Sequence, residues 1–91
     1  MGLKSTTICL GYQQITSLSS AASLTVPAGA TMAVIVPDTQ GVRWRDDGVA
    51  PTASVGMPVA AGVMLNYDGD LKRIQFIQQT ASAVLNVSYY A

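Results

Sequence analysis

Apolar and polar residues alternate with a period of two along most of this chain. β-Branched residues recur throughout, and helical periodicity never persists beyond about a turn and a half. The alternation predicts extended strands, each with one buried and one exposed face. We expect strands over residues 6–13, 22–26, 31–36, 41–46, 57–60, 62–67, 72–79 and 83–90.

Proline, glycine and aspartate separate these segments. Proline fixes φ and glycine tolerates positive φ, so both favour turns. Turn signals lie at 27–29, 37–41, 46–48, 51, 56–58 and 68–69. Their close spacing predicts an all-β fold for residues 1–91 as one domain. We expect a single small antiparallel β-sandwich or jelly-roll-like barrel of about seven or eight short strands, with the strand order left open.

Three segments carry more specific expectations. Residues 32–36 are continuously apolar, which predicts a central strand covered on both faces. The Asp68-Gly69 pair predicts a tight hairpin turn between residues 63–67 and 71–77, because glycine tolerates positive φ. Residues 17–23 are rich in serine and alanine, which fits either a loop or a weak edge strand.

The strand expected at 41–46 carries the single tryptophan. Val42 and Trp44 share one face and Arg43 and Arg45 share the other, which is typical of a half-buried strand. With the following aspartates, the two arginines fit intersubunit ion pairs, because a planar guanidinium matches a carboxylate. A solvated arrangement on an exposed strand face fits equally well.

The composition favours association. Apolar residues make up 49% of the chain and charged residues 11%, against about 25% charged in typical soluble domains. The formal net charge is zero, so copies do not repel one another. We expect a homo-oligomer, a trimer or a dimer. Without a basic excess, neither nucleic acid nor a membrane surface is an expected partner.

The residues of common catalytic sites are missing, because the chain contains no histidine and no glutamate. This excludes histidine-based triads and histidine-ligated metals, so we expect no enzyme, no cofactor and no metal. The aspartates mostly adjoin glycines and fit solvated turns; a cation site shared by Asp46, Asp47, Asp68 and Asp70 is the alternative. Cys9 has no partner for an internal disulfide, and we expect it to be a small apolar filler.

Six segments carry a family resemblance: 24–30 (LTVPAGA), 42–48 (VRWRDDG), 51–54 (PTAS), 56–62 (GMPVAAG), 76–77 (FI) and 85–91 (LNVSYYA). From about residue 23 onward the chain resembles short virion structural proteins of tailed bacteriophages and prophages, similar to capsid decoration or cement proteins. The resemblance implies an oligomer that binds the assembled head, with the major capsid protein or another virion protein as partner. It also implies synthesis in the bacterial cytoplasm and residence in the phage particle.

Other functions fit the same sequence. One is a structural role at the head-tail junction or in the tail. Another is a virion-associated receptor- or carbohydrate-binding module, which requires an exposed aromatic platform, with Trp44, Tyr67 and Tyr90 as candidates. A third alternative is a small enzyme that uses aspartate with serine or tyrosine.

The residues expected to contact partner subunits come from two parts of the chain. Residues 51–58 are poor in charge and fit either an extended arm against a neighbour or an edge strand of the same subunit. Tyr89 and Tyr90 point to opposite faces of the last strand, so we expect one to pack inward and the other to meet a partner or solvent. The expected interface residues are Arg43, Arg45, Asp46, Asp47, Val55, Met57 and Tyr90.

Overall fold

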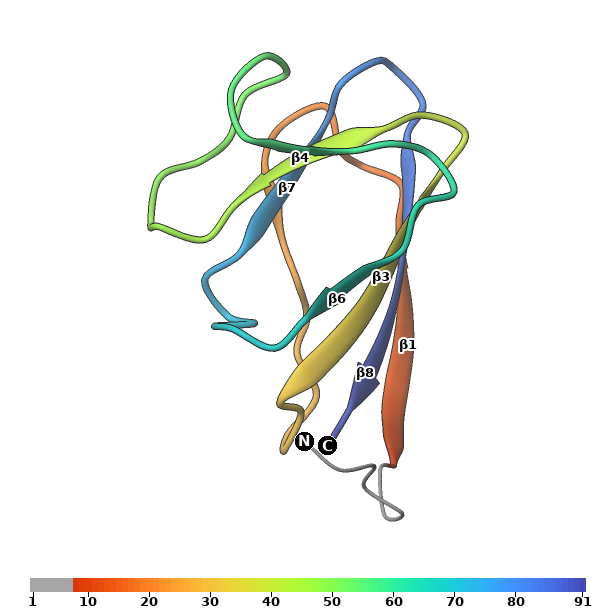
Figure 1. Ribbon diagram of the computed structural model, residues 1–91, viewed down its shortest axis with the longest axis vertical. Helices are drawn as coiled ribbons and strands as arrows, with labels where there is room; N and C mark the ends of the chain where they lie inside the picture. Colours follow the sequence, from red (N-terminus) through yellow and green to blue (C-terminus); the bar gives the residue numbers. More distant parts are fainter. Residues whose placement is uncertain (1–7) are drawn as a thin grey trace.

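Two four-stranded antiparallel sheets face each other in the computed structural model, which describes residues 8–91 (Figure 1). The first, here called the long-stranded sheet, has the order β1-β8-β3-β6, and the second, the short-stranded sheet, has the order β2-β7-β4-β5. The strands are β1 (Cys9–Ile15), β2 (Ala22–Ser23), β3 (Met32–Asp38), β4 (Val42–Arg45), β5 (Met57–Val59), β6 (Leu65–Tyr67), β7 (Gln75–Gln78) and β8 (Val84–Tyr90).

The predicted all-β sandwich is confirmed. Each of the eight expected segments overlaps one observed strand, although β1 and β3 each end two residues later than expected, and residues 8–91 contain no helix. No helix that could cross a membrane is therefore present among these residues. Alternating residues of β3 and β8 point between the sheets, where Ile35, Leu85 and Val87 are fully buried.

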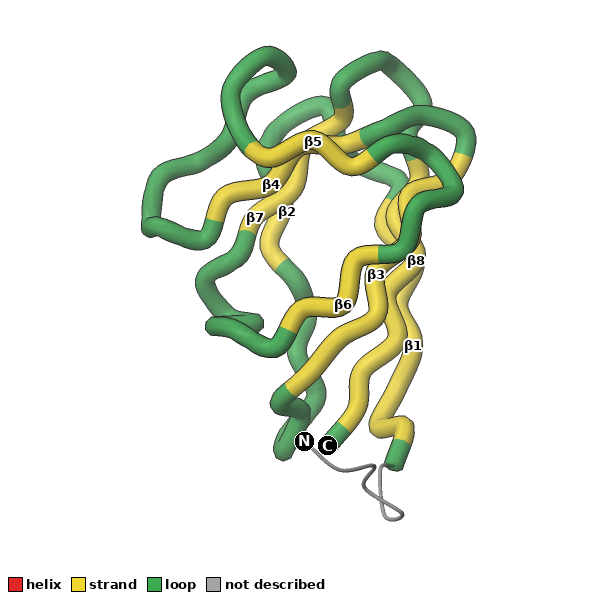
Figure 2. The backbone as a smooth tube through the Cα atoms, viewed as in Figure 1, coloured by secondary structure: helices red, strands yellow, loops and turns green. Residues whose placement is uncertain are grey.

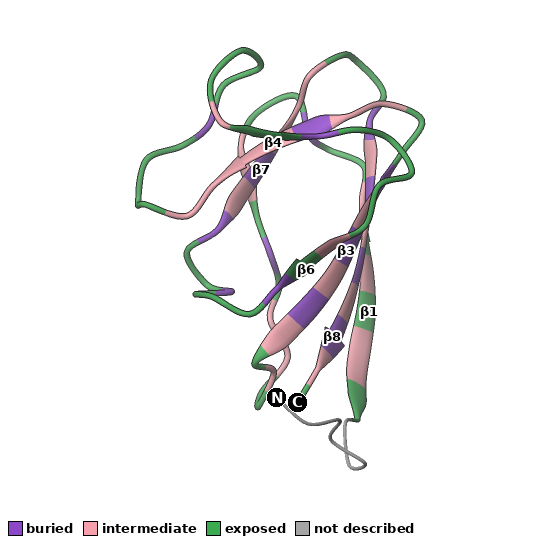
Figure 3. Ribbon diagram, in the orientation of Figure 1, coloured by how far each residue is buried: buried purple, intermediate pink, exposed green. Residues whose placement is uncertain are grey.

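The core lies between the two sheets and takes side chains from both, as the buried positions in Figure 3 show. Phe76 of β7 and Val42 of β4 meet residues of β3 and β8 in one cluster. The connections also contribute, because Leu18, Leu71 and Ile74 are buried although they lie outside strands. The two sheets thus share a single hydrophobic core.

The tight hairpin expected at Asp68-Gly69 is wrong. β6 pairs with β3, whereas β7 pairs with β2 and β4, so the chain crosses from one sheet to the other between them. The amides of Arg73 and Ile74 both donate to the carbonyl of Asp70, which turns the chain after Leu71. Burial of Leu71 and Ile74 in the shared core anchors this crossover. A two-residue hairpin turn would instead keep β6 and β7 paired in the same sheet.

The two-sided burial expected for residues 32–36 is also wrong. β3 is an interior strand of its sheet, but its burial alternates: Ala33 and Ile35 are buried, while Val34 and Val36 are half-buried on the outer face. No further layer covers that face within residues 8–91, so the apolar run supplies a partly exposed surface.

Two smaller expectations have opposite outcomes. Ala22–Ser23 forms an edge strand beside β7, one of the two alternatives for residues 17–23. Cys9, expected to be an apolar filler, is exposed, because it lies at the start of an edge strand on the outer face of the sheet. Its thiol lies 3.7 Å from the carbonyl oxygen of Gly11 and 3.6 Å from the hydroxyl of Ser88.

Candidate functional site

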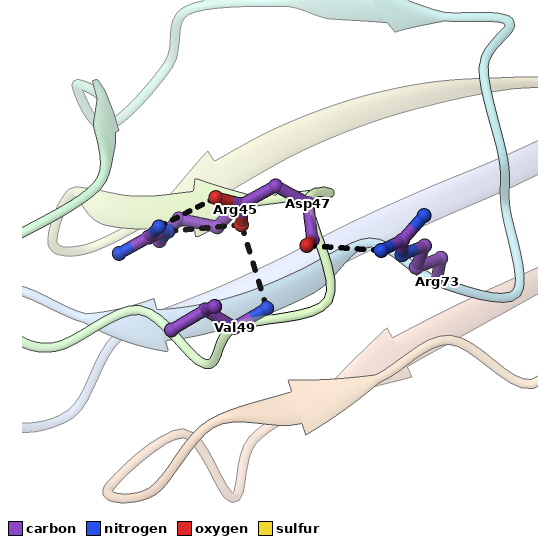
Figure 4. A network of polar contacts seen from close by, with 4 residues as sticks. All are labelled: Arg45, Asp47, Val49 and Arg73. Carbon is purple, nitrogen blue, oxygen red and sulfur yellow. Dashed lines mark hydrogen bonds and ion pairs between the residues drawn. The ribbon is translucent and has the colours of Figure 1, made fainter.

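The exit of β4 holds a bidentate ion pair. Arg45 donates from Nε to Asp47 Oδ1 at 3.0 Å and from its terminal nitrogen to Oδ2 at 2.5 Å (Figure 4). The hydrogen bond from Arg45 lowers the pKa of Asp47 to about 2. The Val49 amide donates to the same carboxylate at 3.4 Å, and Arg73 donates to the Asp47 carbonyl at 2.9 Å. The turn after β4 is thereby fixed from two sides.

Asp46 points the other way and joins the two sheets. Its Oδ2 accepts a hydrogen bond of 2.6 Å from the hydroxyl of Tyr67, which belongs to β6 of the long-stranded sheet. Burial, followed by this bond to Asp46, raises the pKa of Tyr67 to about 12. Trp44 stands edge-on to the Tyr67 ring, with centroids 5.9 Å apart at 61°. Tyr67 thus contacts both the Asp46 carboxylate and the indole ring of Trp44.

Arg43 forms hydrogen bonds with backbone carbonyl groups of its own chain. It donates from Nε to the carbonyl of Ala53 at 3.1 Å and from a terminal nitrogen to the carbonyl of Gly56 at 2.8 Å. Gly56 has φ +140°, and a Cβ there would lie 3.1 Å from the Trp44 carbonyl oxygen, so the position requires glycine. Arg43 thus holds the β4–β5 connection against β4.

An open hollow of about 540 Å³ lies beside β4 and β5. It gathers five of the seven expected interface residues, Arg45, Asp46, Asp47, Val55 and Met57, around Trp44 and Gly56. Its lining combines an aromatic ring, the Arg45–Asp47 ion pair and the exposed aliphatic side chains of Val55 and Met57. We call this site the β4–β5 hollow.

The remaining two expected residues lie outside the β4–β5 hollow. Arg43 faces the backbone of residues 53–56, and its pairing with an aspartate of another subunit stays a prediction. Tyr90 is half-buried on the outer face of the long-stranded sheet, where its hydroxyl accepts a hydrogen bond of 3.2 Å from Ser88. Tyr89, by contrast, packs in the core, as one of the two tyrosines was expected to.

Residues 51–58 fold back on their own subunit. Pro51 is buried, and Thr52 and Val55 exchange backbone hydrogen bonds of 2.9 and 3.2 Å that close a turn. The chain then enters β5, where Met57 lies opposite Trp44. The segment is therefore a turn and an edge strand, one of the two expected alternatives. Val55 and Met57 nevertheless remain more than half exposed.

Residues 8–91 contain no group of three or more acidic or cysteine side chains arranged to hold a metal ion. The cation site considered for Asp46, Asp47, Asp68 and Asp70 is not formed. Asp46 instead accepts from Tyr67, Asp47 from Arg45 and Val49, and Asp70 from the Lys72 amide. The first two carboxylates organise the rim of the β4–β5 hollow.

Several exposed apolar residues escaped the sequence reasoning. Val49, Val63 and Met64 are between 51 and 59% exposed and, with Val55 and Met57, belong to the segment that joins β4 to β6. We call these five residues the apolar rim. Val63 and Met64 precede β6, whereas the expected strand began at residue 62 and assigned them to the sheet. A signal was available in the Ala61-Gly62 pair, which forms a turn immediately before them.

Comparison with known proteins gives no assignment: no family model, curated protein or solved structure matches the chain. The geometry of the β4–β5 hollow and the apolar rim is thus the main evidence on function.

Proposed function

We propose that this chain is a structural component of a bacteriophage particle, a capsid decoration protein that binds the assembled head. The observation that carries the proposal is the apolar rim, five aliphatic side chains that are each more than half exposed. Burying exposed aliphatic side chains against another protein is favourable, because it removes apolar area from water. The segments that resemble small virion proteins include 51–54 and 56–62, which contain Met57 and adjoin Val55 and Val63.

The charge pattern supports an adhesive role. The formal net charge is zero and charged residues are 11% of the chain, so association meets little electrostatic repulsion. In the β4–β5 hollow, Arg45 and Asp47 already satisfy each other, so a partner surface has to desolvate a neutral pair and not an isolated charge. Binding through Val55 and Met57 beside this pair combines apolar burial with a polar rim.

The test is sedimentation of the purified protein with assembled heads that lack it. We expect the wild-type chain to sediment with the heads, and Val55→Asp and Met64→Asp each to weaken binding at least tenfold. Thr80→Asp is the matched control, because Thr80 is exposed but lies in the β7–β8 connection. A wild-type chain that stays in the supernatant, or rim variants that bind like the control, would refute the proposal.

A receptor- or carbohydrate-binding module is the second candidate, and the β4–β5 hollow favours it. Trp44 lies in the hollow beside the planar groups of Arg45 and Asp47, and sugars are commonly bound by an aromatic ring next to such polar groups. A glycan array separates the candidates. Binding that is lost in Arg45→Met but kept in Met64→Asp supports the module, whereas an empty array with head binding supports decoration.

A further inference from the structure

The four edges of the two sheets differ greatly in length. β2 has two residues, β5 has three and contains Pro58, and β6 has three and is followed at once by Asp68. Short strands, proline and charge are the usual protections against pairing between edges. β1 has seven residues, CLGYQQI, with neither charge nor proline, and lies at the outside of its sheet in Figure 2. It is the one long edge among residues 8–91.

The described segments next to this edge carry no charge either. β8, which pairs with β1, contains no charged residue, and neither do residues 16–37. Every charged side chain of residues 8–91 falls between positions 38 and 73: Asp38, Arg43, Arg45, Asp46, Asp47, Asp68, Asp70, Lys72 and Arg73. A strand that adds to β1 therefore meets no charged side chain of β1, β8 or residues 16–37.

The side chains of β1 leave its free edge open. Tyr12, 62% exposed, donates to Asn86 Oδ1 at 2.5 Å, and Gln14 Nε2 donates to the same oxygen at 3.1 Å. Asn86 belongs to β8, so both side chains lean inward over the sheet. On the opposite face, Gln13 accepts from Thr25 and Tyr89. Three consecutive side chains are thus fixed away from the unpaired backbone.

The edge is also regular and has room beside it. The pairing irregularity with β8 is confined to Cys9–Gly11, so residues 11–15 pair in continuous register. An open hollow of about 400 Å³ runs along β1, bounded on its other side by residues 25–27. β1 thus has a regular backbone, open space beside it and neither charge nor proline to prevent pairing. These are the properties of an edge to which another strand can add.

We propose that β1 pairs antiparallel with β1 of a second copy about a two-fold axis near Tyr12. A second copy fits better than another strand because it is equally uncharged, has the same length and carries zero net charge. The result is one eight-stranded sheet, β6-β3-β8-β1 continued by the same four strands in reverse. This inference goes beyond the proposed function, since dimer formation requires no capsid.

Size-exclusion chromatography with light scattering tests the dimer. We expect the wild-type protein to be a dimer. Tyr12→Lys should raise the dissociation constant of the dimer at least tenfold, because the two-fold axis places two ammonium groups opposite each other. Asn66→Lys is the matched control, since Asn66 is exposed on the same face at the opposite edge. Circular dichroism checks that both variants fold.

Chemical cross-linking provides an independent measurement on the folded protein. In a Cys9→Ser background, Tyr12→Cys should give a covalent dimer with a short bifunctional thiol reagent, because opposite Cβ atoms in a strand pair lie about 5 Å apart. Asn66→Cys in that background should give no covalent dimer, because Asn66 lies at the opposite edge of the sheet. A wild-type monomer, a trimer, or a dimer insensitive to Tyr12→Lys overturns the inference. None of these outcomes depends on binding to heads.

Discussion

Three strands of the long-stranded sheet have seven residues, whereas those of the short-stranded sheet have two to four. The interior strands β3 and β8 pair with neighbouring strands on both sides, and the single charged residue of the three long strands is Asp38 at the end of β3. The short-stranded sheet has long connections, where Arg43 and Arg73 bind backbone carbonyl groups directly. Arginine side chains thus fix the connections of the short-stranded sheet, whereas long strand ladders order the other sheet.

The largest expected effect tests whether the two sheets are one cooperative unit. Leu85→Ala in β8 and Phe76→Ala in β7 each remove a fully buried side chain, which should cost about 3 to 5 kcal/mol of unfolding free energy. Urea unfolding followed by Trp44 fluorescence and by far-ultraviolet circular dichroism should give coincident transitions. Separate transitions in Phe76→Ala would mean that the short-stranded sheet unfolds by itself.

A second prediction tests the role of arginine in the short-stranded sheet. Arg43→Met removes two charge-assisted hydrogen bonds to backbone carbonyls and should cost about 2 kcal/mol. Arg45→Met is the matched control on the same strand; because its ion pair is exposed, its urea midpoint should stay close to that of wild type. Equal urea midpoints for Arg43→Met and Arg45→Met would contradict the stabilising role assigned to the Arg43 hydrogen bonds in the short-stranded sheet.

A third prediction concerns the hydrogen bond between the sheets. Tyr67→Phe deletes the bond to Asp46 and should cost about 1 kcal/mol. The pKa values of Tyr67 and Tyr89 are raised to about 12. The unfolded chain then loses protons first, so stability should fall as pH rises from about 10 to about 12. Tyr67→Phe should make stability fall less steeply with pH. If thermal melts show the same dependence of stability on pH as in wild type, the raised pKa of Tyr67 is contradicted.

The smallest effect belongs to the exposed ion pair. Because the pKa of Asp47 is lowered to about 2, its contribution to stability is present above about pH 4 and is lost as pH falls toward 2. Wild type and Asp47→Asn should therefore differ slightly in urea midpoint at pH 6 and coincide at pH 2. A difference that persists at pH 2 would show that Asp47 acts through something other than its charge.

Sequence patterns located the strands well but did not determine how they pair. The Asp68-Gly69 pair predicts a hairpin, but the following Leu71 and Ile74 are core residues that carry the chain across to the other sheet. Local turn chemistry indicates where a chain bends. Which strand it joins next depends on burial of residues distant in sequence.

The candidate site shows the same division. The sequence selected Arg45, Asp46, Asp47, Val55 and Met57, and these residues do surround one hollow. It did not distinguish Arg43 from Arg45, because both alternate with Trp44 on a single strand. Their different roles depend on what lies beside each side chain. Arg43 lies beside the turn at 52–55, and Arg45 lies beside the exposed carboxylate of Asp47.

The fold class and the approximate positions of the eight strands follow from the amino-acid sequence alone, because a period of two and turn-forming residues are local properties of the chain. The same holds for the low charge that favours association. Only the folded structure shows the strand order, the crossover after β6, the internal use of Arg43 and the open edge of β1. Each of these depends on which distant segments become neighbours, and that follows from the packing of one shared core.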